Sequence, residues 1–212
     1  MRALAVTPIH LPPEEVRRRQ ARYDRLAPPG LSVELRDVGP AAPASLDDEA
    51  SIRASEREVA AALAAAGDGW DAAFPDCVLD PAVPEGPASD QGVPVYGLLK
   101  LSSMHLSVKN VRFGAVVRNE AIGAELGRRL KTYGLDACVA GIAVLELPFD
   151  AVADAGAWNA ALGEAADALA AAGATAVING CSAVDVEEDR SAARVVDPTA
   201  LALRLMTIGG SA

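Results

Sequence analysis

The feature that most constrains the fold is an alternation along the chain of short apolar runs and longer segments with helical periodicity. Parallel strands need crossover connections, which are usually helices, so this alternation predicts an α/β fold with parallel sheets. Pro75 lacks a ladder donor, so the third strand is expected to end just before Cys77. The expected strands are 3–7, 31–38, 71–76, 93–96, 111–117, 136–145, 175–179 and 194–196; the expected helices are one opening at 12–13, then 47–66, 98–108, 120–133, 158–172 and one after 198.

The order of elements starts over near residue 111 and divides the chain into two similar halves. In both halves a cysteine directly follows a buried strand: WDAAFPDC ends at Cys77 and ATAVINGC ends at Cys181, 104 residues later. This weak repeat predicts two pseudo-symmetric, doubly wound, flavodoxin-like halves, each with a four-stranded, mainly parallel sheet. We assign 1–95 plus 197–212 to the first half and 96–196 to the second.

Composition limits the partners of the chain. The formal net charge of −10 disfavours binding to nucleic acid or an anionic membrane, because those surfaces are bound through clustered lysine and arginine. The apolar run at the N-terminus is too short for a signal-peptide core, and no stretch is long enough to span a bilayer. Three widely spaced cysteines argue against a disulfide framework. We expect a cytoplasmic homo-oligomer that acts on a small molecule.

The positions of two cysteines suggest acid/base chemistry. Ligands of doubly wound sheets sit beyond the carboxyl ends of the strands, where free backbone N–H groups lower the pKa of a thiol. Inversion of a stereocentre needs one group to remove a proton and another to return one to the opposite face. Cys77 and Cys181 are candidates for these roles, although their positions alone, without the flanking motifs, fit ordinary buried residues better. Cys138 lies in a strand-like run and is predicted to be core.

The segments around both cysteines form an ordered set of motifs: WDAAFPDC at 70–77 followed by DP at 80–81, PVYG at 94–97, MHL at 104–106, FGAVV at 113–117, GATAVINGCSA at 173–183 and VDP at 196–198. This set resembles the hydantoin racemase branch of the aspartate/glutamate racemase superfamily over most of the chain. The resemblance implies a racemase or epimerase with the active site between its two halves and without metal or organic cofactor. It also implies that Cys77 and Cys181 act on an acidic carbon next to a carbonyl, in a hydantoin, an amino acid or a related compound.

The same resemblance leaves other chemistries open. Relatives that work as maleate-type isomerases keep both cysteines and use one thiol as a nucleophile, whereas arylmalonate decarboxylases keep only the cysteine that matches Cys181. A cysteine-dependent isomerase or lyase is therefore an alternative to a racemase. A noncatalytic relative that binds a small ligand is a further alternative.

Two strand ends depart from the family that the chain resembles. Thr7-Pro8 opens a segment where many relatives carry Asn-Pro-Asn-Thr, and Arg118-Asn119 stands where relatives usually have threonines. We expect all four residues to bind substrate. The Arg118 guanidinium could hold a carboxylate or other anion bidentately, helped by the following helix N-terminus. A surface arginine that begins a helix is an equally good interpretation.

Residues next to the cysteines are expected to stabilise charge. The backbone N–H groups of Val78 and Ser182 would donate to an enolate-like oxygen. Asp76 and Asp80 flank Cys77 and could orient the substrate or tune the thiol, although Asp80 fits a turn equally well.

Two histidines are weaker candidates. His10 follows the first strand end and could reach the active site, although a loop histidine is often only solvated. His105 lies in a helical pattern and is predicted to be structural.

Overall fold

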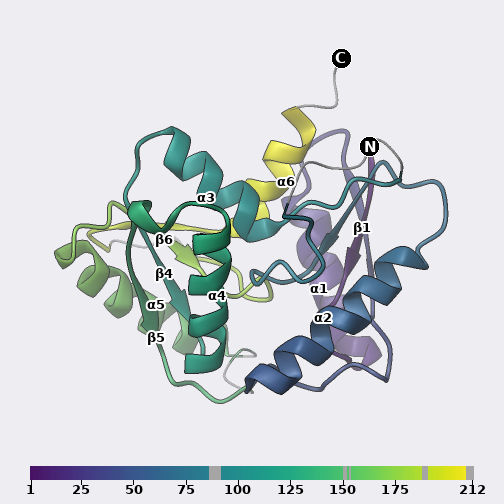
Figure 1. The fold of residues 1–212 in the computed structure, drawn as a ribbon, viewed down its shortest axis with the longest axis horizontal. Coiled ribbons are helices and arrows are strands. Elements are labelled where there is room, and N and C mark those ends of the chain that lie inside the picture. Colours follow the sequence, from purple (N-terminus) through teal and green to yellow (C-terminus); the bar gives the residue numbers. More distant parts are fainter. Residues whose placement is uncertain (86–91, 150–151, 153, 188–190, 209–212) are drawn as a thin grey trace. The chain divides into compact units, whose positions relative to one another are not determined.

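The computed structural model describes residues 1–85, 92–149, 152, 154–187 and 191–208 of the 212-residue chain. Strands and helices alternate as the sequence predicts (Figure 1). The strands are β1 (Arg2–Val6), β2 (Ser32–Arg36), β3 (Ala72–Pro75), β4 (Phe113–Val117), β5 (Val139–Val144), β6 (Ala176–Asn179) and β7 (Arg194–Val196). The helices are α1 (Pro13–Leu26), α2 (Glu49–Ala64), α3 (Leu98–Val108), α4 (Glu120–Thr132), α5 (Ala155–Ala171) and α6 (Pro198–Ile208), and a short 3₁₀ helix, η1 (Asp136–Cys138), precedes β5.

The chain forms two compact units. Unit 1 contains Met1–Leu98 and Thr199–Ala212, and unit 2 contains Leu99–Pro198. The sheet of unit 1 has the order β2-β1-β3, and the sheet of unit 2 has the order β5-β4-β6-β7. All of these strand pairs are parallel, so the predicted α/β class with parallel sheets is confirmed.

In unit 1, helices α1 and α2 cover opposite faces of the sheet. Leu4 of β1 and Ala73 of β3 pack with Val59 of α2. The next residue of β3, Phe74, contacts Tyr23 of α1 with ring centroids 5.6 Å apart. Successive side chains of a strand point to opposite faces of the sheet. Ala73 and Phe74 therefore show that α2 covers one face and α1 the other.

In unit 2, helices α4 and α5 divide the sheet in the same way. Val116 of β4 packs in a core with Trp158 of α5. The next residue, Val117, faces Gly123 of α4 so closely that a Cβ on this glycine would lie 3.4 Å from the valine Cγ2. Both units are therefore doubly wound, with a core on each side of a parallel sheet.

The sheet of unit 1 differs from the expected four strands. The segment 93–96 pairs with β3 through a single bridge, between Ala73 and Val95. The Ala73 N–H points away from β1 and donates to this segment. The Asp76 N–H points toward β1 and donates to it at 2.7 Å. The backbone nitrogen of Pro75 faces the same side of β3 as that of Ala73, but proline has no N–H to donate. The pairing between β3 and the segment 93–96 therefore cannot continue. The described part of the sheet has three strands for this reason, and β3 ends just before Cys77 as expected.

The prediction that Cys138 lies inside a strand and in the core is wrong. Cys138 is the last residue of η1, and β5 begins only at the next residue. Its N–H donates to the Leu135 carbonyl at 2.9 Å, which is the i→i+3 bond of a 3₁₀ turn. The thiol is partly exposed and lies 3.4 Å from the Ser107 hydroxyl.

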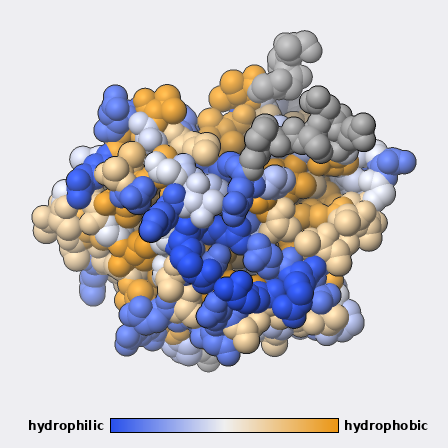
Figure 2. Space-filling model, viewed as in Figure 1, coloured by the Kyte–Doolittle hydropathy of each residue, from blue (hydrophilic) through white to orange (hydrophobic). Residues whose placement is uncertain are grey.

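Polar residues are distributed widely over the surface. Figure 2 shows hydrophilic residues interspersed with hydrophobic ones on the face in view. Within the described ranges, no helix combines the length and the apolar character needed to cross a membrane. Large apolar side chains that are exposed in these ranges are Met104, Val108, Phe149 and Ile208.

Glu15 of α1 links the stability of unit 1 to pH. Its carboxylate accepts hydrogen bonds from Arg18 Nε at 2.7 Å and from Arg19 Nε at 2.9 Å. Burial raises the pKa of Glu15, but the two guanidinium groups outweigh burial and lower this pKa from 4.5 to about 2. A carboxyl group whose pKa is lowered by folding stabilises the fold above its unfolded pKa and loses that contribution as the pH falls through the folded pKa.

We expect Glu15→Gln to reduce the loss of stability between pH 4.5 and pH 2, because the variant has no carboxyl group to protonate in this window. The free energy of unfolding is measured by urea titration, followed by circular dichroism, at several pH values. Glu14→Gln, at the exposed neighbouring position, is the matched control and should keep the pH dependence of the unsubstituted protein. An unchanged pH dependence in Glu15→Gln would contradict the prediction.

Candidate functional site

Cys77 lies at the carboxyl end of β3, two residues beyond the last strand residue, Pro75. Its side chain is buried, with 7% of the residue surface exposed. The Leu79 backbone N–H donates to Cys77 Sγ at 3.4 Å. The turn after β3 thus places a backbone donor against the sulfur of this cysteine.

Asp76 joins the end of β3 to helix α1. Its carboxylate accepts hydrogen bonds from Tyr23 Oη at 2.7 Å and from Arg19 Nη1 at 3.0 Å. Burial and the Asp76 charge raise the pKa of Tyr23 well above its usual range, so the phenol remains a hydrogen-bond donor. Asp76 is only 1% exposed. Its contacts with α1 fix the strand end from which Cys77 emerges.

The residues that follow Cys77 form a tight turn. The Asp80 N–H donates to the Cys77 carbonyl at 3.3 Å, and the Val83 N–H donates to the Asp80 carbonyl at 3.2 Å. Asp80 and Ala82 have φ values of 49° and 60°, in the left-handed region that costs free energy for residues with a Cβ. The buried Asp80 carboxylate occupies the space where a Cβ would lie on Gly97. Asp80 is therefore part of the turn, close-packed against the backbone.

The sequence analysis did not identify Asp37, which organises the segment after β1. Asp37 accepts hydrogen bonds from His10 Nδ1 at 2.7 Å, Leu11 N–H at 2.9 Å and Thr7 Oγ1 at 3.2 Å. Burial raises the pKa of Asp37, but these bonds and one from the Gly39 N–H outweigh it and lower the pKa. His10, which was predicted as a weak candidate, is thus held by a carboxylate while its ring stays half-exposed.

The other candidate residues of unit 1 differ in whether their polar groups already form hydrogen bonds within the protein. Thr7 is fully buried, and its hydroxyl also accepts from the Val38 N–H at 2.9 Å. The Pro8 carbonyl accepts from Ser55 Oγ at 2.5 Å. Within the part of the chain that the structure describes, the Val78 N–H donates to no protein acceptor. The Val78 backbone therefore offers a donor directly after the cysteine.

Cys181 follows β6 and is partly exposed. Gly180, directly before it, donates its N–H to the Val116 carbonyl of β4 at 2.7 Å. A Cβ at Gly180 would overlap this carbonyl oxygen and lie 2.8 Å from Val117 Cγ1. Only glycine permits this close approach. The hydrogen bonding between β6 and β4 therefore extends to the residue directly before the cysteine.

The sequence motifs also gave no sign of the hydrogen bonds that the Asn179 side chain makes beside Cys181. Asn179 is the last residue of β6 and is fully buried. Its Nδ2 donates to the Cys181 carbonyl at 3.0 Å, and its Oδ1 accepts from Trp158 Nε1 at 3.0 Å. The amide therefore connects the backbone of the cysteine to helix α5.

Arg118 is buried, with 7% of its surface exposed, so the interpretation as a surface arginine is wrong. Its Nη1 donates to the Leu147 carbonyl at 3.4 Å, and its guanidinium lies 5.7 Å from the centroid of the Phe149 ring. The segment after β5 folds over the side chain and removes it from solvent. A buried guanidinium presents its charge to a ligand with less screening than an exposed one.

The register of unit 2 relates Arg118 to Cys181. Val116 of β4 pairs with Asn179 of β6, and Arg118 and Cys181 each follow the paired residue by two positions. Both residues thus lie at the carboxyl edge of the same sheet, at the ends of neighbouring strands.

Two further predicted residues lie at this edge of unit 2. Asn119 is the N-cap of α4, where its Oδ1 accepts from the Ile122 N–H at 2.9 Å. Ser182 lies in the turn directly after Cys181 and is 7% exposed. His105, by contrast, lies within α3 with a partly exposed side chain.

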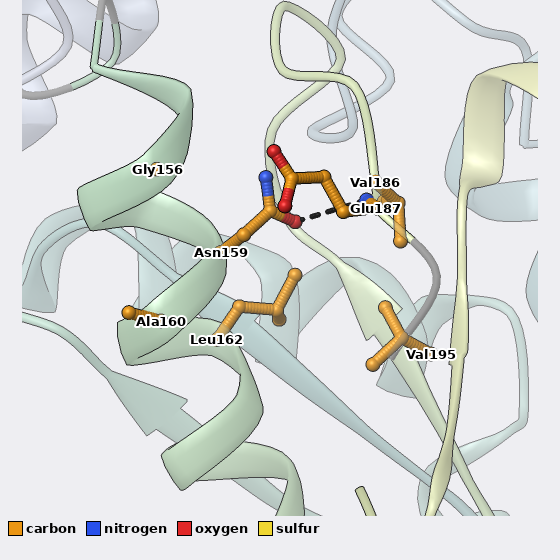
Figure 3. A pocket seen from close by; sticks show the side chains of 7 residues that line it. All are labelled: Gly156, Asn159, Ala160, Leu162, Val186, Glu187 and Val195. Carbon is orange, nitrogen blue, oxygen red and sulfur yellow. Dashed lines mark hydrogen bonds between the residues drawn. The ribbon is translucent and has the colours of Figure 1, made fainter. Parts of the chain in front are cut away.

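Two pockets lie away from both cysteines. One, in unit 2, has a volume of about 280 Å³ and lies between α5 and the segment that includes Glu187 (Figure 3). The other, in unit 1, has a volume of about 480 Å³ and lies beside α2 and Trp70. Among the described residues, no group of three or more His, Cys, Asp or Glu side chains is arranged to hold a metal ion.

Comparisons with known proteins place the fold. No family model and no curated protein matches the sequence, but solved structures do. Allantoin racemase from Pseudomonas fluorescens matches with a TM-score of 0.83 and 19% identity, over 98% of this chain and 90% of that chain. The chain has the same fold as this racemase.

Two other matches show the breadth of this racemase fold. An aspartate racemase homologue from Pyrococcus horikoshii matches with a TM-score of 0.61 and 14% identity, over 100% of both chains. Arylmalonate decarboxylase matches with a TM-score of 0.61 and 15% identity, over 100% of this chain and 94% of that chain. The fold that the resemblance of the motifs implies is thus confirmed.

We expect Gly180→Ala to destabilise the protein by about 1–3 kcal/mol, because the new methyl group meets the β4 backbone. Gly127→Ala is the matched control in the same unit. Its Cβ would meet only Ile142 Cδ1, at 3.4 Å, and alanine is favoured over glycine inside a helix by up to about 1 kcal/mol. Urea unfolding measures both changes. Equal stability of the two variants would show that the close approach at Gly180 is absent.

Proposed function

We propose that this chain is a cofactor-independent racemase or epimerase that inverts a carbon next to a carbonyl group. The observation that carries this proposal is the position of two thiols, Cys77 and Cys181, each directly beyond a buried strand at the carboxyl edge of a parallel sheet. The fold shared with allantoin racemase supports it. Hydantoins such as allantoin, and amino acids such as aspartate, are the substrate classes to test first. A small-molecule substrate also accords with the net charge of −10.

The proposed reaction is a pair of proton transfers. The thiolate of one cysteine removes the proton from the acidic carbon, and the electron pair of the broken C–H bond moves onto the carbonyl to give an enolate. The thiol of the other cysteine then protonates the opposite face, and the electron pair returns to form the new C–H bond. The first sulfur ends as a thiol and the second as a thiolate, so the roles are exchanged for the reverse reaction.

Contacts around each thiol support these roles. The Leu79 N–H, which donates to Cys77 Sγ, would stabilise negative charge on this sulfur in one direction of the reaction. Backbone N–H groups of Val78 and Ser182 would donate to the enolate oxygen, where charge develops. The buried Arg118, at the same sheet edge as Cys181, would hold an anionic group of the substrate. Thr7, Pro8 and Asn119 would shape the substrate site through the segments that they anchor.

The proposal is tested in deuterated water with single enantiomers of allantoin, a substituted hydantoin and aspartate. Optical rotation follows racemisation, and proton NMR follows the exchange of hydrogen at carbon. Cys77→Ser and Cys181→Ser should each slow racemisation by at least about a hundredfold, because each removes one of the two acid/base groups. Cys138→Ser is the matched control and should remain fully active. Full activity of either of the first two variants would remove its cysteine from the mechanism.

The match to arylmalonate decarboxylase favours a lyase as the second candidate. In that case the chain would release carbon dioxide from a malonate derivative and protonate the resulting enolate, with one cysteine sufficient for turnover. Gas release in the presence of Cys77→Ser would support this alternative. A thioether adduct detected by mass spectrometry would instead indicate a covalent isomerase. Ligand binding without turnover, unaffected by either cysteine substitution, would indicate a noncatalytic protein.

A further inference from the structure

The segment that carries the second thiol is attached to helix α5 at both of its ends. This segment, residues 179–187, is called the thiol loop below. At its start, Trp158 Nε1 donates to Asn179 Oδ1 at 3.0 Å. At its end, Asn159 Nδ2 donates to the Asp185 carbonyl at 3.0 Å. Two consecutive residues of one helix therefore hold a loop of nine residues at both ends.

The attachment at the start of the loop reaches the cysteine itself. Trp158 and Asn179 are both fully buried, and the Asn179 amide passes the contact on to the Cys181 carbonyl, again at 3.0 Å. Asn179 ends an otherwise apolar strand, where an amide is costly unless both of its ends are bonded. Here the oxygen accepts from the indole and the nitrogen donates to the cysteine backbone, so the chain of bonds is complete.

At the end of the loop, hydrogen bonds from Asn159 add to the packing of Val184 and Val186 against the core beneath α5. Asn159 Oδ1 accepts from the Glu187 N–H at 3.2 Å, and Figure 3 shows the asparagine side chain reaching from α5 to this residue. The pocket of about 280 Å³ lies at the same place, lined also by Leu162 and Val195. Where side chains leave such space, a loop can shift unless polar contacts hold it.

We propose that Trp158, Asn159 and Asn179 are positioning residues for the reaction. They fix the backbone of Cys181 against α5 and so keep its sulfur at a constant place relative to the reacting carbon. Displacing a reactive group by about 1 Å can cost about a hundredfold in rate, so a small loosening of the thiol loop should be visible in kcat. This inference rests on the proposed function of Cys181 as one of the two acid/base groups.

The first test compares two variants with a matched control. Trp158→Phe keeps an aromatic ring but removes the indole donor, and Asn159→Ala removes the second attachment from a position that is partly exposed. Both should lower kcat by about tenfold to a hundredfold and change KM by less than about twofold, because the thiol and not the substrate contacts are displaced. Trp70→Phe, which removes an indole bond to the Ala66 carbonyl in unit 1, should leave kcat unchanged.

The double variant Trp158→Phe/Asn179→Ala should lose no more kcat than Asn179→Ala alone, because both residues act through one chain of bonds. Additive losses, or an unchanged kcat in Trp158→Phe and Asn159→Ala, would overturn the proposal. If Trp158→Phe fails to fold, the result for Asn159→Ala decides.

A second measurement separates this inference from the proposed function. In a chain whose Cys77 and Cys138 are replaced by serine, Cys181 is the one remaining thiol. Its alkylation by iodoacetamide should be faster when Asn159→Ala or Trp158→Phe is added, since a loosened loop exposes the sulfur more often. This readout needs no turnover. Failure of the unsubstituted protein to racemise any substrate would count against the function, whereas unchanged alkylation would count against the positioning role.

Discussion

Parallel strand pairing is the constraint on which the rest of the structure depends. In a parallel sheet all carboxyl ends meet at one edge, so residues far apart in the sequence become neighbours there. The β1–β3 pairing puts Thr7 and Cys77 at the edge of one sheet, and the β4–β6 pairing puts Arg118 and Cys181 at the edge of the other. Each unit thus places one thiol at the carboxyl edge of its sheet, the edge at which doubly wound folds generally bind ligands.

The chain just before each thiol is anchored by the same kind of hydrogen bond. A buried polar residue just before the cysteine, Asp76 in unit 1 and Asn179 in unit 2, bonds to an aromatic donor on a helix packed against the sheet. Buried polar groups must be hydrogen-bonded, so each helix can dock in one position. The packing of each helix therefore fixes the position of the strand end and of the sulfur that follows it.

The fold by itself does not decide the reaction, because racemases and a decarboxylase share it. The chemistry depends on side chains at the two edges. The loop after β1 departs from the amide-rich pattern of the relatives that the motifs resemble, and Asp37 now binds Thr7 and His10 within the protein. Arg118 brings a buried positive charge to the other edge. In the function that we propose, the Arg118 guanidinium would hold an anionic group of the substrate.

The sequence by itself determined the α/β class, the order of the elements and the location of both cysteines at strand ends. Periodicity, turn residues and Pro75 report on local backbone structure, and local signals are readable from neighbouring residues. The tertiary structure alone decided the Thr7–Asp37 bond across 30 residues, the Trp158–Asn179 bond across 21, the burial of Arg118 and the 3₁₀ position of Cys138. Those features depend on strand register and helix docking, which arise from contacts between distant segments and leave no local pattern.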